Sequence, residues 1–388
     1  MTETVFHSFF LIFTGAAIIA TLAIYGRQPL LVAYIALGAI IGPYGIGWVQ
    51  DIDQLSEMAE IGIIFLLFLL GLDMQPQALM NVFRQATLTT LFSSILFASI
   101  GYIIAYLFGF NGMECSIIGL AMMFSSTIIG IKLLPTTILH HRHSGDMMVG
   151  LLLTQDFIAI FVLLVLLSGE GGQVDMLQIG KSLLALPILI LLAVGFVRYV
   201  LLKLVMRFDR IDEYIFLLSI GWCMGLAAVA EVVGLSHEIG AFLAGITLAT
   251  SPISQHIALK LKPLRDFFLI VFFFSLGASF NLGLLPEIAL AAAVLGVVML
   301  GLKPLTFRVL LGRQSENPTL AWDIGCRLGQ ISEFSLLIAY VASDASMIGD
   351  NASHLIQATA ILTFLVSSYI VVFNFPTPIA VSDKLRRD

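Results

Sequence analysis

Two polar residues stand side by side in an otherwise apolar segment of the sequence. Gln155 and Asp156 fall in the middle of LLLTQDFIAI, inside a run long enough to cross a membrane. A carboxylate at the centre of a bilayer costs on the order of 3 kcal/mol on insertion scales. Asp156 could serve as a structural ion pair or as a protonated hydrogen-bonding group. The residues favour a carboxylate that exchanges a proton for a cation, with the Gln155 amide oxygen beside it as a ligand for a hard monovalent ion.

A second polar patch lies in the preceding apolar segment, MMFSSTIIGIKLLP. Its members are Ser125, Ser126 and Thr127, and a glycine and a proline follow them. Such a patch can satisfy backbone groups where a membrane helix is interrupted, and its hydroxyls together with the carbonyls freed there can coordinate a cation beside Asp156. Serine and threonine also pack silently between membrane helices, so the patch alone supports either role.

A third polar stretch, RLGQISEFS, interrupts an apolar segment near the C-terminus and contains Arg327, Gln330 and Glu333. Two interrupted helices at corresponding positions in two halves of a chain indicate a transporter site. We expect Glu333 to be a structural brace near the crossing rather than an ion ligand. The role of Arg327 stays open at this point.

One lysine lies within the apolar run VVMLGLKPLTFRVLL. Lys303 could extend toward the membrane surface that Arg308 and Arg313 mark. We favour a buried charge that either opposes the ends of the interrupted helices or pairs with Asp156. Pro304 directly after it would loosen that helix.

The composition requires a membrane to position these residues. Of the 388 residues, 59% are hydrophobic and only 11% are charged, and the mean hydropathy is +1.02. Soluble domains carry about 25% charged residues. The sequence contains no nucleophile–base set or metal-ligand cluster of an enzyme, and no basic surface for nucleic acid. We therefore predict an all-α polytopic membrane protein that is not an enzyme and needs no cofactor.

Apolar runs of about 20 residues cross a bilayer as helices. The sequence predicts thirteen of them, at residues 6–25, 29–48, 56–72, 85–108, 114–135, 145–168, 178–205, 212–232, 236–250, 265–282, 286–311, 318–341 and 354–375.

The charges between these segments predict the orientation of the chain. Loops after odd-numbered segments carry sixteen of the nineteen Lys and Arg residues, whereas loops after even-numbered segments are mainly acidic. By the positive-inside rule the basic side is cytoplasmic. The N-terminus is then outside and the C-terminus inside.

The chain also contains a faint internal repeat. YIALGAIIGP resembles AFLAGITLATSP and aligns Gly38 with Gly245, while FLLFLLGLDM resembles VFFFSLGASF and aligns Gly71 with Gly277. The offsets are 207 and 206 residues, and an odd number of membrane crossings separates the copies. The second copy should therefore be inverted, which is typical of secondary transporters.

The repeat predicts the domain organisation. A transmembrane domain spans residues 1–377, with a first repeat over about 6–168, a linker helix over about 178–205 and a second repeat over about 212–375. Residues 378–388 form a short cytoplasmic tail.

Six features occur in an order that matches a known family. They are SST, TQD, GAFLAG, FFFSLGASF, Lys303 and GQISEF. Together they resemble the monovalent cation:proton antiporter-2 family, and within it the Kef-type potassium:proton antiporters. The resemblance implies the thirteen-helix antiporter fold with two crossed, broken helices, a separate domain that forms a homodimer, and alternating access.

The resemblance also implies roles for individual residues. Asp156 resembles the aspartate that binds the cation or the proton, and Gln155 the glutamine typical of Kef members. Ser125–Thr127 and Gln330–Glu333 resemble the unwound parts of the two crossing helices, and Lys303 the charge-compensating lysine. Arg327 is not part of the family pattern. Kef proteins usually continue into a cytoplasmic nucleotide-binding regulatory domain, so such a domain or subunit is an expected partner.

These observations favour a secondary active antiporter of the bacterial inner membrane. We expect it to exchange a monovalent cation, K⁺ before Na⁺, for H⁺ with no net charge moved. The alternatives are a Na⁺/H⁺ antiporter of the same fold, a passive cation channel and a non-transporting membrane subunit.

Overall fold

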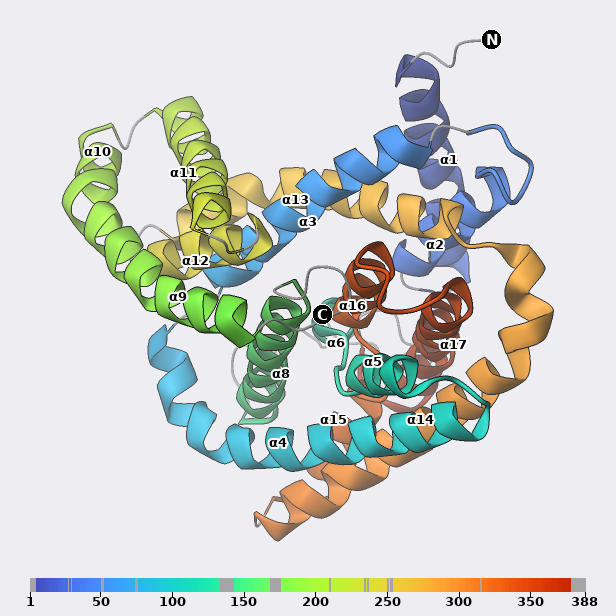
Figure 1. Ribbon diagram of the computed structural model, residues 1–388. Coiled ribbons are helices and arrows are strands. Elements are labelled where there is room, and N and C mark those ends of the chain that lie inside the picture. The colour runs from blue at the N-terminus through green and yellow to red at the C-terminus, as the bar shows by residue number, and fades with distance from the viewer. Residues whose placement is uncertain are drawn as a thin grey trace.

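The computed structural model is helical, as Figure 1 shows. It describes residues 5–26, 28, 30–49, 52–73, 76–132, 143–167, 176–208, 211–233, 235, 237–249, 251, 254–314 and 316–377. The predicted tail and the predicted loop cations Arg27, Arg142 and Arg210 fall outside these ranges.

The helices form two groups, which alternate along the chain. The first helix group consists of α1 (Val5–Tyr25), α2 (Leu30–Ile41), α3 (Ile52–Asp73), α9 (Met176–Phe196), α10 (Leu202–Arg207), α11 (Asp212–Val232), α12 (His237–Ala249) and α13 (Ser254–Ala278). A π-helical turn, η2 (Val197–Leu201), joins α9 to α10, so the predicted linker helix runs through all three. Helices α3 and α13 cross at the centre of this group (Figure 1).

The second helix group contains the polar interruptions. It consists of α4 (Pro76–Leu107), α5 (Gly112–Met122), α6 (Thr127–Lys132), α8 (His143–Leu167), α14 (Leu285–Arg313), α15 (Pro318–Arg327), α16 (Glu333–Asp344) and α17 (Asp350–Asn374). A short 3₁₀ helix, η3 (Leu282–Leu284), leads from α13 in the first group into α14 in the second. Large buried side chains, among them Phe97, Phe124 and Phe307, fill the centre of the second group.

Each predicted membrane segment coincides with a helix, with a pair of helices that meet at an interruption or, for residues 178–205, with the continuous α9–η2–α10 helix. Six helices in the described part of the chain are long and apolar enough by themselves to cross a bilayer. The all-α architecture is thus confirmed for the described residues, while thirteen crossings stay a prediction. The six are Phe6–Tyr25, Ala86–Leu107, Ala185–Arg207, Glu213–Val232, Leu282–Arg313 and Asp350–Asn374.

The four glycines of the sequence repeat lie where helices touch backbone to backbone. A Cβ added to Gly38 of α2 would collide with the backbone of α13, and one added to Gly277 of α13 would collide with α2. In the same way Gly71 of α3 meets the backbone of α12, and Gly245 of α12 meets that of α3. Because the repeat aligns α2 with α12 and α3 with α13, the two crossings are equivalent when the halves are exchanged.

Candidate functional site

The first interruption separates α5 from α6. Helix α5 ends at Met122, residues 124–126 have no helical structure, and the chain becomes helical again at Thr127. The Ser126 hydroxyl accepts the backbone N–H of Ile129 at 3.1 Å. This hydroxyl satisfies one of the donors that a helix start leaves without an intrahelical partner.

The second interruption separates α15 from α16. Ser332 is the N-cap of α16, and its hydroxyl accepts the Phe334 N–H at 3.1 Å. The Ile331 N–H donates to the Thr363 hydroxyl of α17 at 3.1 Å. Side chains therefore replace the helical hydrogen bonds that are missing at this interruption, as they do at the first one.

Side chains also join the two interruptions to each other. The Ser125 hydroxyl donates to the Leu328 carbonyl at 2.8 Å. The Gln330 amide donates to the Ser126 carbonyl at 3.3 Å, and its oxygen accepts the Ser367 hydroxyl of α17 at 2.9 Å. The two interrupted helices thus meet at Ser125, Ser126 and Gln330, which the sequence singled out.

Lys303 of α14 lies at this junction and is completely buried. Its ammonium donates to the Phe124 carbonyl at 2.6 Å, to the Gln330 carbonyl at 3.1 Å and to the Ser125 hydroxyl at 3.3 Å. Both carbonyls follow the C-terminal end of a short helix, where the helix dipole is negative. Of the two roles predicted for Lys303, the contacts correspond to the first, because within the described residues no ion pair joins it to Asp156.

Asp156 lies on the other side of the first interruption, on α8. Its side chain is 1% exposed, and the Thr127 hydroxyl donates to the two carboxylate oxygens at 3.0 and 3.3 Å. Glu333, the first residue of α16, is close enough to repel this carboxylate electrostatically. A buried carboxylate beside a second acidic residue favours a bound proton or cation.

Gln155 points toward the first interruption. Its amide oxygen accepts the Ser125 N–H at 3.0 Å, and its amide nitrogen donates to the Met123 carbonyl at 3.5 Å. The neighbours Gln155 and Asp156 therefore have different partners in the structure. Gln155 supports the interrupted backbone, and Asp156 contacts the Thr127 hydroxyl.

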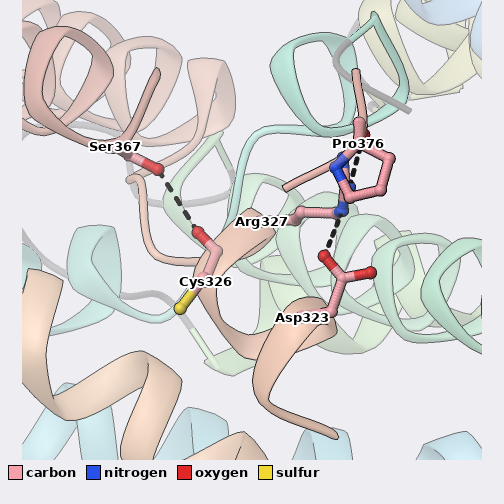
Figure 2. Close-up of polar contacts among 5 residues, drawn as sticks. All are labelled: Asp323, Cys326, Arg327, Ser367 and Pro376. Atoms are coloured by element: carbon pink, nitrogen blue, oxygen red, sulfur yellow. Dashed lines mark hydrogen bonds and ion pairs between the residues drawn. The ribbon is translucent and has the colours of Figure 1, made fainter. Parts of the chain in front are cut away.

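Arg327 is the last residue of α15 and braces that helix against the end of α17. Figure 2 shows its guanidinium between the Asp323 carboxylate and the Pro376 carbonyl. Nε donates to Asp323 at 2.7 Å and Nη2 donates to Pro376 at 2.8 Å. The guanidinium also lies 5.8 Å from the centre of the Phe375 ring. This fixes the position of α15 just before its interruption.

Sequence reasoning missed the contribution of α17 to the site. Thr363 and Ser367, which serve the second interruption, are four residues apart and so lie on one face of the helix. Ser335 of α16 donates to the Ala121 carbonyl at the end of α5. Hydroxyl residues within apolar segments were the available signal, but their partners lie far away in the sequence.

A cavity of about 270 Å³, lined by both polar and apolar side chains, lies between the two helix groups. Its lining includes Ser275 of α13, Tyr340 of α16 and His354 of α17. The His354 Nε2 atom accepts the backbone N–H of Asn281 at 3.0 Å, and its Nδ1 atom lies 2.7 Å from the Asp350 carbonyl. His354 thus links α17 to the segment that connects the two groups.

The sequence relationships agree with this architecture. The family model described as sodium/hydrogen exchanger, transmembrane, matches residues 10–375. The chain is 30% identical over 354 residues to K(+) efflux antiporter 5 of Arabidopsis thaliana, covering 88% of this chain and 61% of that protein. It is 27% identical over 365 residues to the iron transporter MagA of Paramagnetospirillum magneticum, covering 92% of this chain and 84% of that protein. The named relatives are transporters rather than enzymes, and the chain spans about 60% of the length of the plant antiporters it matches.

A solved structure shares the fold. The sodium proton antiporter MjNhaP1 from Methanocaldococcus jannaschii, at pH 8, matches with a TM-score of 0.66 at 18% identity, covering 93% of this chain and 96% of that one. The predicted resemblance to a cation:proton antiporter family is confirmed by the family match. The chain is a multi-pass membrane protein and belongs to the sodium/hydrogen exchanger family.

Proposed function

We propose that the chain is a secondary active antiporter that exchanges a monovalent cation for a proton at Asp156. The supporting observation is a buried carboxylate whose hydrogen-bond partner, Thr127, begins the helix after an interruption. A charged carboxylate without a counterion is unfavourable in such a place, so a cation or a proton must neutralise it.

The exchange is strict because only a neutralised Asp156 can cross between the two sides at low cost. The second helix group, which holds Asp156, moves against the first group and exposes the site to each side in turn. Ser125, Ser126 and Gln155 keep the interrupted backbone in place, and Lys303 offsets the negative helix ends. Glu333, Gln330 and Arg327 act as structural support.

The proposed organisation follows the sequence repeat. Residues 1–377 form the transport domain, with repeats over 6–168 and 212–375 in opposite orientations and with two crossed, broken helices. The reciprocal crossings of α2 with α13 and of α3 with α12 support this organisation. The protein acts as a homodimer in the bacterial inner membrane with its C-terminus in the cytoplasm, where a nucleotide-binding regulatory domain or subunit would join it.

Potassium is the proposed cation, with sodium second. Gln155 is the residue typical of Kef-type antiporters, and plant relatives are named as potassium efflux antiporters. The structural neighbour is named as a sodium proton antiporter and another relative as an iron transporter. A comparison of K⁺, Na⁺, Rb⁺, NH₄⁺ and Fe²⁺ therefore covers the relevant cargo classes.

The experiment is cation-driven proton movement in proteoliposomes that contain a pH-sensitive dye. Wild-type protein should couple an imposed K⁺ gradient to proton flux. Asp156→Asn should abolish the coupling, because an amide neither binds a proton nor balances a cation. Asp344→Asn, at an exposed acid, should transport normally. Wild-type rates in Asp156→Asn would refute the assigned role.

One titrating carboxylate with a neutral neighbour predicts one proton for one cation. The exchange then moves no net charge. The transport rate should therefore stay nearly constant when a membrane potential is imposed across the same vesicles without valinomycin. A steep dependence on potential would exclude this stoichiometry, as would proton release from Lys303 during the cycle.

Two other functions give different results in the same vesicles. A passive cation channel would conduct cations without coupling to a pH gradient. A non-transporting subunit would give no flux with any of the five cations.

A further inference from the structure

The cavity of about 270 Å³ between the helix groups has one wall from each group. In each wall the lining residues follow the spacing i, i+3, i+4 and i+7, which places them on one face of a helix. The two faces together contain Phe272, Ser275, Leu276 and Ser279 of α13, and Asp350, Ser353, His354 and Gln357 of α17. The cavity is therefore formed where one face of α13 lies opposite one face of α17.

The lining is rich in oxygen for a space between membrane helices. Nine of its fourteen residues carry a side-chain oxygen. Ser275, Ser353 and Gln357 are buried, with 7%, 5% and 6% of their surface exposed. A cavity of this size holds several water molecules, since one water occupies about 30 Å³ of the liquid. The lining thus suits a hydrated polar ligand better than an apolar one.

Gln357 offers an oxygen that the protein itself does not use. Its amide nitrogen donates to the Ser353 hydroxyl at 3.4 Å, whereas its oxygen has no hydrogen-bond partner within the described part of the chain. A buried amide oxygen without a donor is unfavourable, and such an oxygen is a suitable ligand for a hard cation. His354, one turn earlier on α17, differs because both of its ring nitrogens contact backbone groups.

Acidic side chains gather where α17 begins. Asp350 is exposed, lines the cavity and takes part in no ion pair among the residues that the structure describes. Glu114 accepts the Gly349 N–H at 3.2 Å, and Glu287 accepts the Asn351 amide at 3.3 Å. The lining contains no lysine or arginine. This end of the cavity therefore attracts a cation and repels an anion.

The cavity lies near Asp156 but is distinct from its site. Tyr340 lines the cavity and follows Glu333 by seven residues on α16, so the two lie on one face of that helix, about 10 Å apart along its axis. Glu333 is the acidic neighbour of Asp156. A cation in the cavity would therefore be about two helical turns from the neighbourhood of Asp156.

We propose that this cavity binds a second monovalent cation, which keeps part of its hydration shell. The Gln357 oxygen is the direct ligand, and Asp350, seven residues earlier on the same face of α17, attracts the cation electrostatically. A divalent cation would need more carboxylate ligands than this lining provides. A role of this site as an entry point to Asp156 rests on the proposed function, whereas the binding itself does not.

Thermal unfolding in detergent tests the binding, with K⁺ as the probe. Asp156→Asn removes the candidate transport site, so any stabilisation that K⁺ still provides reports a second site. Potassium chloride replaces N-methylglucamine chloride at constant ionic strength. The melting temperature of Asp156→Asn should rise with the K⁺ concentration and reach a plateau, which gives an apparent affinity.

Variants of the cavity in the Asp156→Asn background should change this affinity in opposite directions. Gln357→Leu should weaken it about tenfold, because a ligand of a charged group is lost. Asp350→Asn should weaken it by up to about fivefold, the effect of an exposed charge pair. Gln357→Glu should strengthen it, because a carboxylate replaces a neutral amide. A variant that only disturbs folding cannot strengthen binding, so this variant keeps the test interpretable.

Glu213→Gln, at an exposed acid of α11 outside the lining, is the matched control and should leave the affinity unchanged. The inference is wrong if K⁺ does not stabilise Asp156→Asn, or if Gln357→Leu and Gln357→Glu have the same affinity. The proposed function fails separately. K⁺ binding in the cavity together with an absence of cation–proton exchange by wild-type protein would refute antiport and leave this site in place.

Discussion

Asp156 and Lys303 are two ionisable residues that the membrane interior disfavours, and the structure compensates them differently. Lys303 has three oxygen acceptors that the helix interruptions provide. Among the described residues, Asp156 accepts a hydrogen bond from the Thr127 hydroxyl and has an acidic neighbour in Glu333. An ammonium whose donors all have acceptors suits a permanent structural role, whereas a buried carboxylate with one hydroxyl donor suits a group that is neutralised and released.

Thr127 provides a test of this contrast. Thr127→Val keeps the shape but removes the hydroxyl that donates to Asp156, whereas Thr127→Ser keeps it. A hydrogen bond to a charged group contributes about 1.5–3 kcal/mol. In proteoliposomes we expect Thr127→Val to change the apparent cation affinity by about tenfold or more, on the same basis. Thr127→Ser should stay near the wild-type value, and an unchanged affinity in Thr127→Val would contradict the proposed site.

At the scale of helices, the interruptions and the glycine crossings have opposite requirements. The interrupted segments need hydroxyl and amide side chains that replace helical hydrogen bonds. The crossings of α2 with α13 and of α3 with α12 need the absence of a side chain, because the backbones touch. Small residues at helix interfaces allow this close approach in membranes.

Gly38→Ala tests the crossing of α2 with α13. The added methyl group would collide with the Phe274 carbonyl and the Ala278 backbone, so the helices must separate. We expect a lower melting temperature in detergent, with a loss of about 1–3 kcal/mol, the usual cost of overpacking. Gly301→Ala in α14 is the matched control, because its methyl group would meet no atom within 4 Å. Equal melting temperatures for both variants would show that the crossing tolerates the methyl group.

At the scale of the whole molecule, one side chain of α17 connects the second helix group to the segment between the two groups. The His354 Nε2 atom accepts the Asn281 N–H at 3.0 Å, and its Nδ1 atom lies 2.7 Å from the Asp350 carbonyl. Asp350, Tyr340 and Tyr44 line the same cavity. His354 therefore holds α17 to the α13–α14 connection.

This link can be tested by substitution. His354→Leu removes the Nε2 acceptor of the Asn281 N–H, whereas His354→Gln provides an amide oxygen that can accept the same N–H. We expect a lower melting temperature in detergent for His354→Leu, with a loss of about 1 kcal/mol, the net contribution of one hydrogen bond, and a value nearer wild type for His354→Gln. His237→Gln, at a partly exposed histidine paired with Glu231, is the control. Equal melting temperatures for His354→Leu and wild type would exclude the link.

The amino-acid sequence was enough to predict a helical membrane protein and the positions at which its helices are interrupted. These features depend on local composition: apolar runs, hydroxyl patches and the Gly38, Gly71, Gly245 and Gly277 repeat are visible without coordinates. It also singled out Asp156 and Lys303, because ionisable residues are rare in apolar runs.

The partner of each polar residue, by contrast, became known from the packing of the helices. Lys303 binds the Phe124 carbonyl 179 positions away rather than Asp156, and Gln155 turns to the Ser125 backbone although it adjoins Asp156. The contacts of α17 with the second interruption and of His354 with Asn281 were likewise invisible. The physical reason is that a buried polar group bonds to whichever donor or acceptor the packed helices bring within about 3 Å, and sequence separation does not determine that distance.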